Sequence, residues 1–489
     1  MKIKNTVYSI LMLCLCALPA AGMLVKGPTD VTYENRTLAQ WPSLRGEDGA
    51  FNTRFFTQAG EWFEDHYAFK NEMVTANALL RAKAFKVSAS DRVVLGKEDW
   101  LYYASSLDDH LGTNLMSERA LFDLAHVQGM TQRELEKKGI RFLFAVAPNK
   151  NSVYPEYMPW YNNRVVSEAG NLENLMPLLE EEAVSCADLK SLLAQEADAP
   201  EREGYLYHKR DSHWTSLGAA LAMDAMLTKL EKVHVSARDM TWHTQKDFTG
   251  DLDEMLFVLA AEAQDEVYFD RPEVFAYVTE NESNFDPWIQ TINPSREGTL
   301  MMYRDSFGNA MVPLFAQEYG NAFFSRGEPY NMSEAITLGA DTVIVLRAER
   351  FLKDMAATPP ALEASAVIPE GNGTITEAEP GAGDENVSHL TAEQNNELYR
   401  LTGTIAPALV DTDSRIYVQV NGEMIYEAFP CRAATEDGET DTAFAVYLSP
   451  LKMIPGVDQI RILVSHEDGL TSVWSGTSPV LNLAGATAG

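Results

Sequence analysis

The chain has 489 residues, and its 71 Asp and Glu against 39 Lys and Arg give a formal net charge of −32. This length is too great for one compact core and predicts two or three domains. Nucleic-acid binding needs Lys and Arg side chains that neutralise phosphates, so the charge excludes DNA and RNA as partners.

The first 26 residues indicate export from the cytoplasm. Lys2 and Lys4 precede an uncharged apolar run over 7–25, and Lys26 follows it. A basic start before an apolar run is typical of an export signal, and this run is near the minimum length that spans a bilayer. We therefore expect residues 1–26 to be a signal peptide or a membrane anchor, and the rest of the chain to be extracytoplasmic.

Residues 27–110 are predicted to lead into the first large domain. A helical stretch is expected from Phe51 to about Ala84. The sequence VVLGKEDWLYY at 93–103 predicts a hairpin, because a polar turn at Gly96–Asp99 separates two apolar runs.

From residue 115 onward, helical and strand patterns alternate. Helices are predicted over 117–138, over 171–183 and after an N-cap at Thr215. Five apolar strands are predicted, at 140–148, 183–189, 299–304, 321–325 and 341–347. Buried strands separated by helices favour an α/β domain whose parallel sheet is covered by helices on both faces, which we place at 27–355.

The C-terminal part differs in composition and in period. Residues 356–390 are rich in Pro, Gly and Glu, as in a linker. Short runs of alternating apolar and polar residues then occupy 391–489. This period predicts a small β-sandwich.

Beyond the N-terminal segment the chain holds two cysteines, Cys186 and Cys431. Their wide separation favours two unpaired thiols, although one long-range disulfide stays open. No C-x-x-C pair occurs, so the sequence gives no support for a structural zinc site.

Three residues have the types needed for acyl transfer through a serine. Ser306 lies between a predicted strand and a predicted helix start, and His213 follows Asp211 by two residues. The serine needs a base, the base needs a partner that fixes its tautomer, and the oxyanion needs donors. We assign these roles to Ser306 as nucleophile, His213 as base and Asp211 as orienting group.

Four further residues are candidates for oxyanion or substrate binding: Asn149, Trp214, Asp305 and Arg304. Asn149, Trp214 and Asp305 also have ordinary structural interpretations, as a turn residue, a packing residue and a helix cap. The pattern H-x-x-D-x-H from His208 to His213 leaves a metal-dependent hydrolase as a minor alternative. We predict no metal and no other cofactor.

Several quoted stretches carry a family resemblance that covers most of residues 30–355. They are ENRTLAQWP, VVLGKEDWLYY, FAVAPNKNSVYPEYMP, DSHW, RDSFGNAM and ADTVIVLRAER. With them the chain resembles exported SGNH hydrolase-like proteins of the AlgX/AlgJ type, including the DHHW family. The resemblance implies a flavodoxin-like α/β fold and a Ser nucleophile preceded in sequence by an Asp-x-His pair.

The resemblance also implies O-acetylation of an exopolysaccharide, with acetyl supplied by a membrane-bound O-acyltransferase. Two features depart from the family. Arg304 stands where the G-D-S block of the family has Gly. A glycine there permits a closer approach of the backbone to the oxyanion than an arginine does. A net charge of −32 repels an acidic polyuronate, so we expect a neutral or amino-sugar glycan.

Two functions therefore compete at this stage. The first is an acetyltransferase or acetylesterase that works through Ser306. The second is a catalytically inactive surface protein of the same fold that binds glycan or a partner.

Overall fold

The computed structural model describes residues 2–27, 38–46, 49–160, 164–199, 203–280, 283–369, 375–378, 381–435 and 438–482. Its chain divides into two compact units. The first unit comprises Met1–Ala104, Lys209–Ser212 and Lys246–Asp265. The second comprises Ser105–His208, His213–Gln245 and Glu266–Gly489.

The first unit begins with α1 (Lys2–Lys26), which contains an apolar span of 21 residues, Thr6–Lys26. This span is long enough to cross a membrane, and an export signal has the same properties. Two helices follow, α2 (Phe55–His66) and α3 (Lys70–Leu80). The sequence had predicted one helical stretch here, but Phe69 has a left-handed backbone with φ 65° and separates the two helices.

The predicted hairpin of the first unit is confirmed. Strands β1 (Val93–Leu95) and β2 (Leu101–Tyr103) pair antiparallel, and the Gly96 N–H donates to the Trp100 carbonyl at 2.8 Å. The hairpin shares an apolar core with α3 and with α10 (Asp251–Leu256). Residues 209–212 and 246–265 therefore return to the N-terminal part of the chain, which the sequence pattern did not indicate.

The second unit is built on a seven-stranded sheet of order β4-β3-β11-β9-β10-β8-β7. Its strands are β3 (Arg141–Ala147), β4 (Cys186–Ala187), β7 (Ala276–Tyr277), β8 (Trp288–Ile292), β9 (Thr299–Arg304), β10 (Asn321–Ser325) and β11 (Thr342–Ala348). The five predicted strands are parallel, as expected. Strands β8 and β7 were not predicted, and they extend one edge antiparallel.

The order of the parallel strands locates the switch point of the sheet. The parallel strands can be numbered 1 to 5 as β9, β10, β11, β3 and β4. With this numbering their order across the sheet, from β10 to β4, is 2-1-3-4-5. This is the order of flavodoxin-like sheets, with the chain entering at a different strand. In such sheets ligands bind at the carboxyl ends of strands 1 and 3, which here are β9 and β11.

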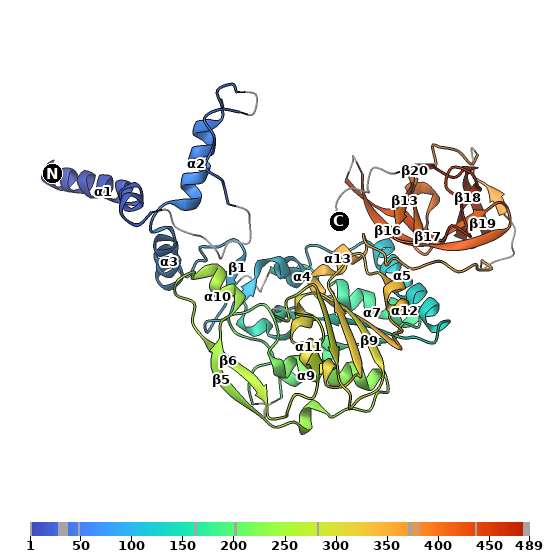
Figure 1. The fold of residues 1–489 in the computed structure, drawn as a ribbon, viewed down its shortest axis with the longest axis horizontal. Helices are drawn as coiled ribbons and strands as arrows, with labels where there is room; N and C mark the ends of the chain where they lie inside the picture. Colours follow the sequence, from blue (N-terminus) through green and yellow to red (C-terminus); the bar gives the residue numbers. More distant parts are fainter. Residues whose placement is uncertain are drawn as a thin grey trace. The chain divides into compact units, whose positions relative to one another are not determined.

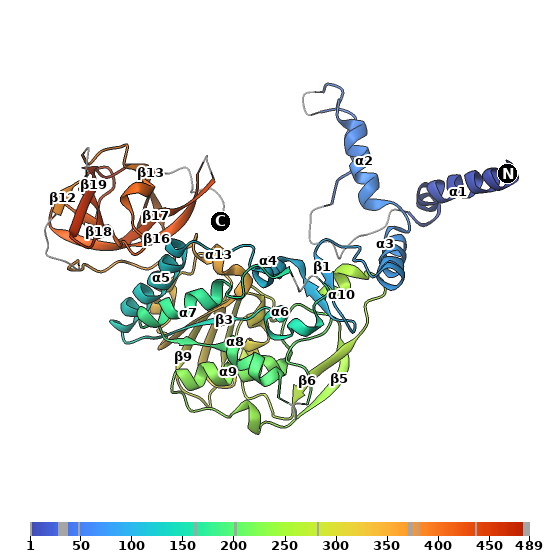
Figure 2. The ribbon, with the colours of Figure 1, turned by 180° about the vertical axis from the view of Figure 1, so that it is seen from behind.

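Helices cover both faces of this sheet (Figures 1 and 2). One face packs on α5 (Glu118–Glu136), α7 (Asn171–Glu181) and α12 (Met332–Thr337). The other face carries α8 (Leu189–Ala197), α9 (Ser216–Lys229) and α11 (Met311–Ala316). Thr215 caps α9 as predicted, because its hydroxyl accepts the Gly218 N–H at 3.3 Å. The remaining short elements are α4 (Leu107–Leu111), α6 (Lys150–Val153), α13 (Leu352–Met355), β5 (Trp242–Phe248) and β6 (Gln264–Phe269).

The C-terminal part forms one curled, largely antiparallel sheet of nine strands rather than a sandwich of two separate sheets. The long strand β16 (Met424–Thr435) pairs with β15 through its first half and with β17 through its second half, so the sheet is continuous. Its curvature encloses an apolar core. The other strands are β12 (Ile375–Glu377), β13 (Val387–Asn395), β14 (Leu398–Ile405), β15 (Ile416–Val420), β17 (Gly438–Leu448), β18 (Gln459–His466), β19 (Gly469–Thr477) and β20 (Leu481–Asn482).

The curled sheet packs against α5. His126 of α5 is fully buried and donates or accepts hydrogen bonds with Glu182 at 2.8 Å and with Glu427 of β16 at 2.9 Å. Burial alone would lower the pKa of His126, but its bonds to two carboxylates raise it above the ordinary value. The boundaries of the expected linker, 356–390, stay a prediction, and within it the backbone of residues 361–367 bonds to both neighbouring parts.

Cys186 and Cys431 are both free thiols in this unit. Burial raises the pKa of each to about 12, so neither is a reactive thiolate near neutral pH.

Candidate active site

The structure brings together two residues that lie 93 positions apart in the sequence. The His213 Nε2 atom is 2.8 Å from the Ser306 Oγ atom. Both side chains are partly buried. A neutral imidazole in this position accepts the serine proton through Nε2, which is the contact that general-base activation of a serine requires.

Asp305 fixes the turn that presents Ser306. One carboxylate oxygen accepts the Phe307 N–H at 2.9 Å, and the other accepts the Ala348 N–H at 2.7 Å. The carboxylate therefore caps the short helix after β9 and ties it to the end of β11. Because a carboxylate that accepts two N–H groups is no oxyanion donor, the predicted oxyanion or substrate-binding role of Asp305 is corrected to a structural one.

Arg304 also has a structural role. Its side chain is fully buried, and its guanidinium donates to the Asn309 side chain and to the backbone carbonyls of Asn284, Asp286 and Asp305. Burial lowers the pKa of Arg304 to about 10. The predicted substrate-binding role is thus corrected. A further residue, Gly308, makes room for the arginine, since a Cβ there would lie 2.4 Å from the Arg304 Cδ.

Trp214 packs against the turn that carries Ser306. Its indole N–H donates to the Phe307 carbonyl at 3.0 Å, and its ring meets the Phe307 ring edge-on at 5.0 Å. Trp214 is 2% exposed, so it packs in the core and does not face a ligand. The packing interpretation that the sequence left open is the one observed. Phe307, which sequence reasoning missed, also contacts the His213 ring at 4.9 Å.

Backbone hydrogen bonds fix the segment around His213. Tyr207 and Trp214 form a β-bridge, and the His208 N–H donates to the His213 carbonyl at 3.3 Å. His208, the first residue of the alternative metal pattern, hydrogen-bonds Glu266 through Nε2 at 3.2 Å. The Nε2 atom of His208 is therefore engaged by Glu266 in this structure.

Asp211 lies in the first unit. It is 4% exposed, and its Oδ2 accepts the Asp251 N–H at 2.7 Å. The Asp251 carboxylate in turn accepts the N–H and hydroxyl of Ser212 at 2.8 and 2.6 Å. Asp251 was not predicted, because nothing in its local sequence marks it. The pairing of Asp211 with the His213 ring stays a prediction.

Asn149 lies at the carboxyl end of β3, beside the end of β11. Its N–H donates to Glu349 at 2.8 Å, and its Nδ2 donates to Asp109 at 3.1 Å. Lys190 is held between Glu349, at 2.8 Å, and Glu173. These contacts hold the Asn149 amide at the same edge of the sheet as Ser306, with β11 between the two strands. Its role as an oxyanion donor stays a prediction.

A polar cavity of about 340 Å³ opens beside these residues. Its lining includes Asp109, Asn151, Glu168, Glu173 and Glu349. Asn151 is 1% exposed, and its Oδ1 has no hydrogen-bond partner among the residues that the structure describes. Burial raises the pKa of Asp109 to about 6. None of these cavity residues was predicted from the sequence, because their spacing follows no motif.

Comparison with known proteins finds similarity over a range that includes part of this site. Residues 93–287 match the family described as SGNH hydrolase-like domain, acetyltransferase AlgX. Over this range the chain is similar to SGNH hydrolase-like domains of the AlgX type. The matched range of this domain includes Asp211 and His213 and ends before Ser306.

Curated relatives agree with this assignment over part of the chain. The probable alginate O-acetylase AlgJ of Pseudomonas syringae pv. tomato is 28% identical over 182 residues, which are 37% of this chain and 44% of that protein. The chain thus matches less than half of the length of this relative.

Solved structures with similar folds include Bacillus cereus PatB1, with a TM-score of 0.41 and 15% identity over 53% of this chain and 96% of that chain. The O-acetyltransferase domain of Pseudomonas putida AlgJ has a TM-score of 0.35 and 16% identity over 53% of this chain and 91% of that chain.

Proposed function

We propose that the chain transfers acetyl groups to a cell-surface or secreted polysaccharide through Ser306, on the extracytoplasmic side of a membrane. The observation that carries this proposal is the 2.8 Å contact between His213 Nε2 and Ser306 Oγ at the switch point of the sheet. The apolar span Thr6–Lys26 and the AlgX-type family match support the location and the reaction class.

The proposed reaction has two steps. In the first, His213 Nε2 takes the hydroxyl proton while Ser306 Oγ bonds to the acetyl carbonyl carbon, and the leaving group of the donor departs with that proton. In the second, a sugar hydroxyl gives its proton to His213 and its oxygen bonds to the same carbon. Ser306 Oγ then leaves and recovers the proton.

Two groups are proposed to assist these steps. Asp211 accepts the Nδ1–H of His213 and so keeps Nε2 free to act as a base. The Ser306 N–H and the Asn149 amide stabilise the oxyanion. The acetyl donor is proposed to be a membrane-bound O-acyltransferase that the α1 segment keeps nearby.

The test is formation of an acetyl-enzyme from p-nitrophenyl acetate, followed by peptide mapping. We expect the acetyl group on Ser306, and we expect Ser306→Ala to lose both the adduct and turnover. Ser475→Ala is a matched control, because Ser475 is exposed on the curled sheet. A wild-type protein that never becomes acetylated and still binds polysaccharide would support the inactive alternative. Competition between water and added sugar then separates esterase from transferase.

We further propose that the polar cavity receives the acceptor sugar. Glu349, which lines the cavity, directly follows Ala348, whose N–H binds the same carboxylate that caps the Ser306 turn. The unpartnered Asn151 Oδ1 needs a donor, and a sugar hydroxyl or ammonium group supplies one. The cavity holds four carboxyl groups and one lysine, so it favours a neutral or amino sugar over a uronate.

Acetylation rates on neutral, glucosamine-containing and uronate oligosaccharides test this acceptor class. We expect the uronate to be the poorest acceptor. Glu168→Gln should raise KM for the amino sugar and leave the neutral sugar unchanged. Glu181→Gln, an exposed acid of α7 that does not line the cavity, is the matched control. Equal rates on all three oligosaccharides would refute the acceptor class while leaving the serine mechanism intact.

A further inference from the structure

Helix α2 has an aromatic face that the described part of the first unit does not bury. Phe55, Phe56, Ala59, Trp62 and Phe63 stand at positions i, i+1, i+4, i+7 and i+8 and fall within an arc of about 120° on a helical projection. The acidic residues of the helix project from the opposite side. The one residue of α2 classed as buried is Asp65, so no apolar side chain of this helix lies in a core.

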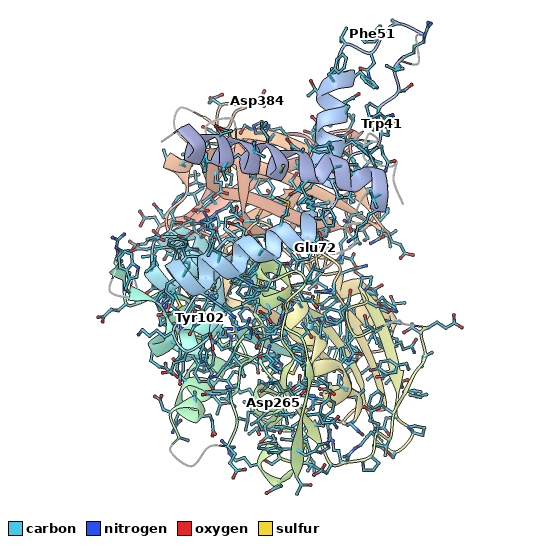
Figure 3. All side chains as sticks on the ribbon, turned by 90° about the vertical axis from the view of Figure 1, so that its left-hand side faces the viewer. Trp41, Phe51, Glu72, Tyr102, Asp265 and Asp384 are labelled. Atoms are coloured by element: carbon cyan, nitrogen blue, oxygen red, sulfur yellow. The ribbon has the colours of Figure 1, made fainter. Side chains whose placement is uncertain are left out.

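The aromatic face continues onto the segment before α2. The Trp41 ring meets Trp62 edge-on at 4.8 Å and Phe55 at 6.2 Å. Trp41 and Phe51 lie beside α2 in Figure 3 and are 61% and 60% exposed. Phe56 is 78% exposed. We call Trp41, Phe51, Phe55, Phe56, Trp62 and Phe63 the aromatic surface. Exposed apolar patches of this kind mark interaction sites.

The end of the apolar helix α1 packs against the turn that follows α2. Lys26, at the end of α1, lies 3.6 Å from Glu72 of α3 and 4.6 Å from the Phe69 ring centroid. Gly22 is so close to the same turn that a Cβ would lie 2.5 Å from Phe69. The end of the apolar span therefore packs against the turn that separates α2 from α3. Trp and Phe side chains beside the end of such a span occupy the place where aromatic residues gather at a membrane surface.

The distribution of charge along the chain also favours a membrane surface as the partner of this segment. Residues 1–104 contain 12 Lys and Arg against 11 Asp and Glu, a net charge of +1, so the rest of the chain carries a net charge of −33. Arg45 and Arg54 flank the aromatic surface. An anionic membrane surface repels the strongly acidic remainder but not this segment.

We propose that α2 lies in the headgroup region of a lipid bilayer, with the aromatic surface turned toward the acyl chains. The segment then works as a second membrane contact beside α1. This proposal stands independently of the serine chemistry. Amphipathic helices with aromatic apolar faces bind bilayer surfaces in this orientation.

Spin labels on opposite faces of α2 test this proposal in the full chain, reconstituted in liposomes that contain anionic lipid. Phe56→Cys places a label on the aromatic surface, and Glu61→Cys is the matched control on the polar face. Cys14 and Cys16 are replaced by Ala, and the same protein without an introduced cysteine measures any labelling of Cys186 and Cys431. Circular dichroism and thermal melts check that each variant folds.

We expect the Phe56 label to collide at least several-fold more with oxygen than with a water-soluble nickel complex, and the Glu61 label to show the reverse. Equal access of the nickel complex to both labels would overturn the proposal. Protection of the Phe56 label only after a membrane-protein extract is added would also overturn it, because a protein would then be the partner. Replacing Phe56 and Phe63 together by Glu should release the label on Trp41→Cys into water.

Discussion

Asp109 is predicted to make the folded protein less stable as the pH rises, and Asp109→Asn to remove this effect. Burial raises the pKa of Asp109 from 3.8 to about 6, so the folded protein holds the proton more tightly than the unfolded chain. The carboxyl group therefore has no destabilising effect below about pH 4. The effect grows between about pH 4 and 6 and is complete above that range.

The magnitude follows from the shift. Roughly two pKa units at 1.36 kcal/mol each give about 3 kcal/mol as an upper limit at pH 8. An asparagine keeps the size of the side chain. The Asn149 Oδ1, which has no partner among the described residues, can accept the new N–H if its amide turns over. We therefore expect Asp109→Asn to be more stable than the wild type at pH 8 and equal to it at pH 4.

Thermal unfolding of both proteins between pH 4 and 8 measures this difference. Asn114→Ala is a useful comparison, because it removes a 2.7 Å hydrogen bond to the Asp109 carboxylate and should raise the pKa further. A stability difference that does not change with pH would refute the reasoning, as would a variant that is less stable at pH 8.

Three other changes are expected to have measurable effects. Gly308→Ala should destabilise the protein by about 1–3 kcal/mol, because its Cβ overlaps the Arg304 side chain, and chemical unfolding measures this. Asp305→Ala leaves two buried N–H groups without an acceptor, which should cost about 1–3 kcal/mol each and slow acylation by p-nitrophenyl acetate. His126→Ala should destabilise by about 3–5 kcal/mol at pH 5.5. This loss should shrink as the pH rises through the raised pKa of His126, because the stability that the charged histidine contributes is lost when it deprotonates. Melts at a series of pH values from 5.5 to 9 measure it.

The parallel core of the fold could be predicted because its strands are buried on both faces and therefore have continuous apolar sequences. Strands β3, β9 and β11 are of this kind. The edge strands β8 and β7 were missed, since one is short and both carry mixed sequences. The curled C-terminal sheet was predicted as β structure, but its continuity depends on the register of β16, which alternation alone does not determine.

Residues of the candidate site could be predicted where their side-chain chemistry suggests a catalytic role. Residues whose role depends on contacts made by the fold could not be predicted. His213 and Ser306 were found from their residue types at the ends of predicted elements. Asp305 and Arg304 were given ligand roles because they adjoin the serine, yet their polar atoms bind backbone groups that come from elsewhere in the chain. Sequence proximity to a nucleophile therefore says little about which side chains face the substrate.

The strand order explains how a histidine that precedes the serine by 93 residues reaches it. In the 2-1-3-4-5 order, β9 and β11 lie at the centre, and β3 and β4 follow them in space although they come first in the chain. The segment that carries His213 follows β4 in the chain, and the chain then enters β9, which leads directly to Ser306. Because Trp214 binds the Phe307 carbonyl, the loop and the serine turn meet through a fixed contact. The proton-transfer geometry thus depends on this contact as well as on the two reacting side chains.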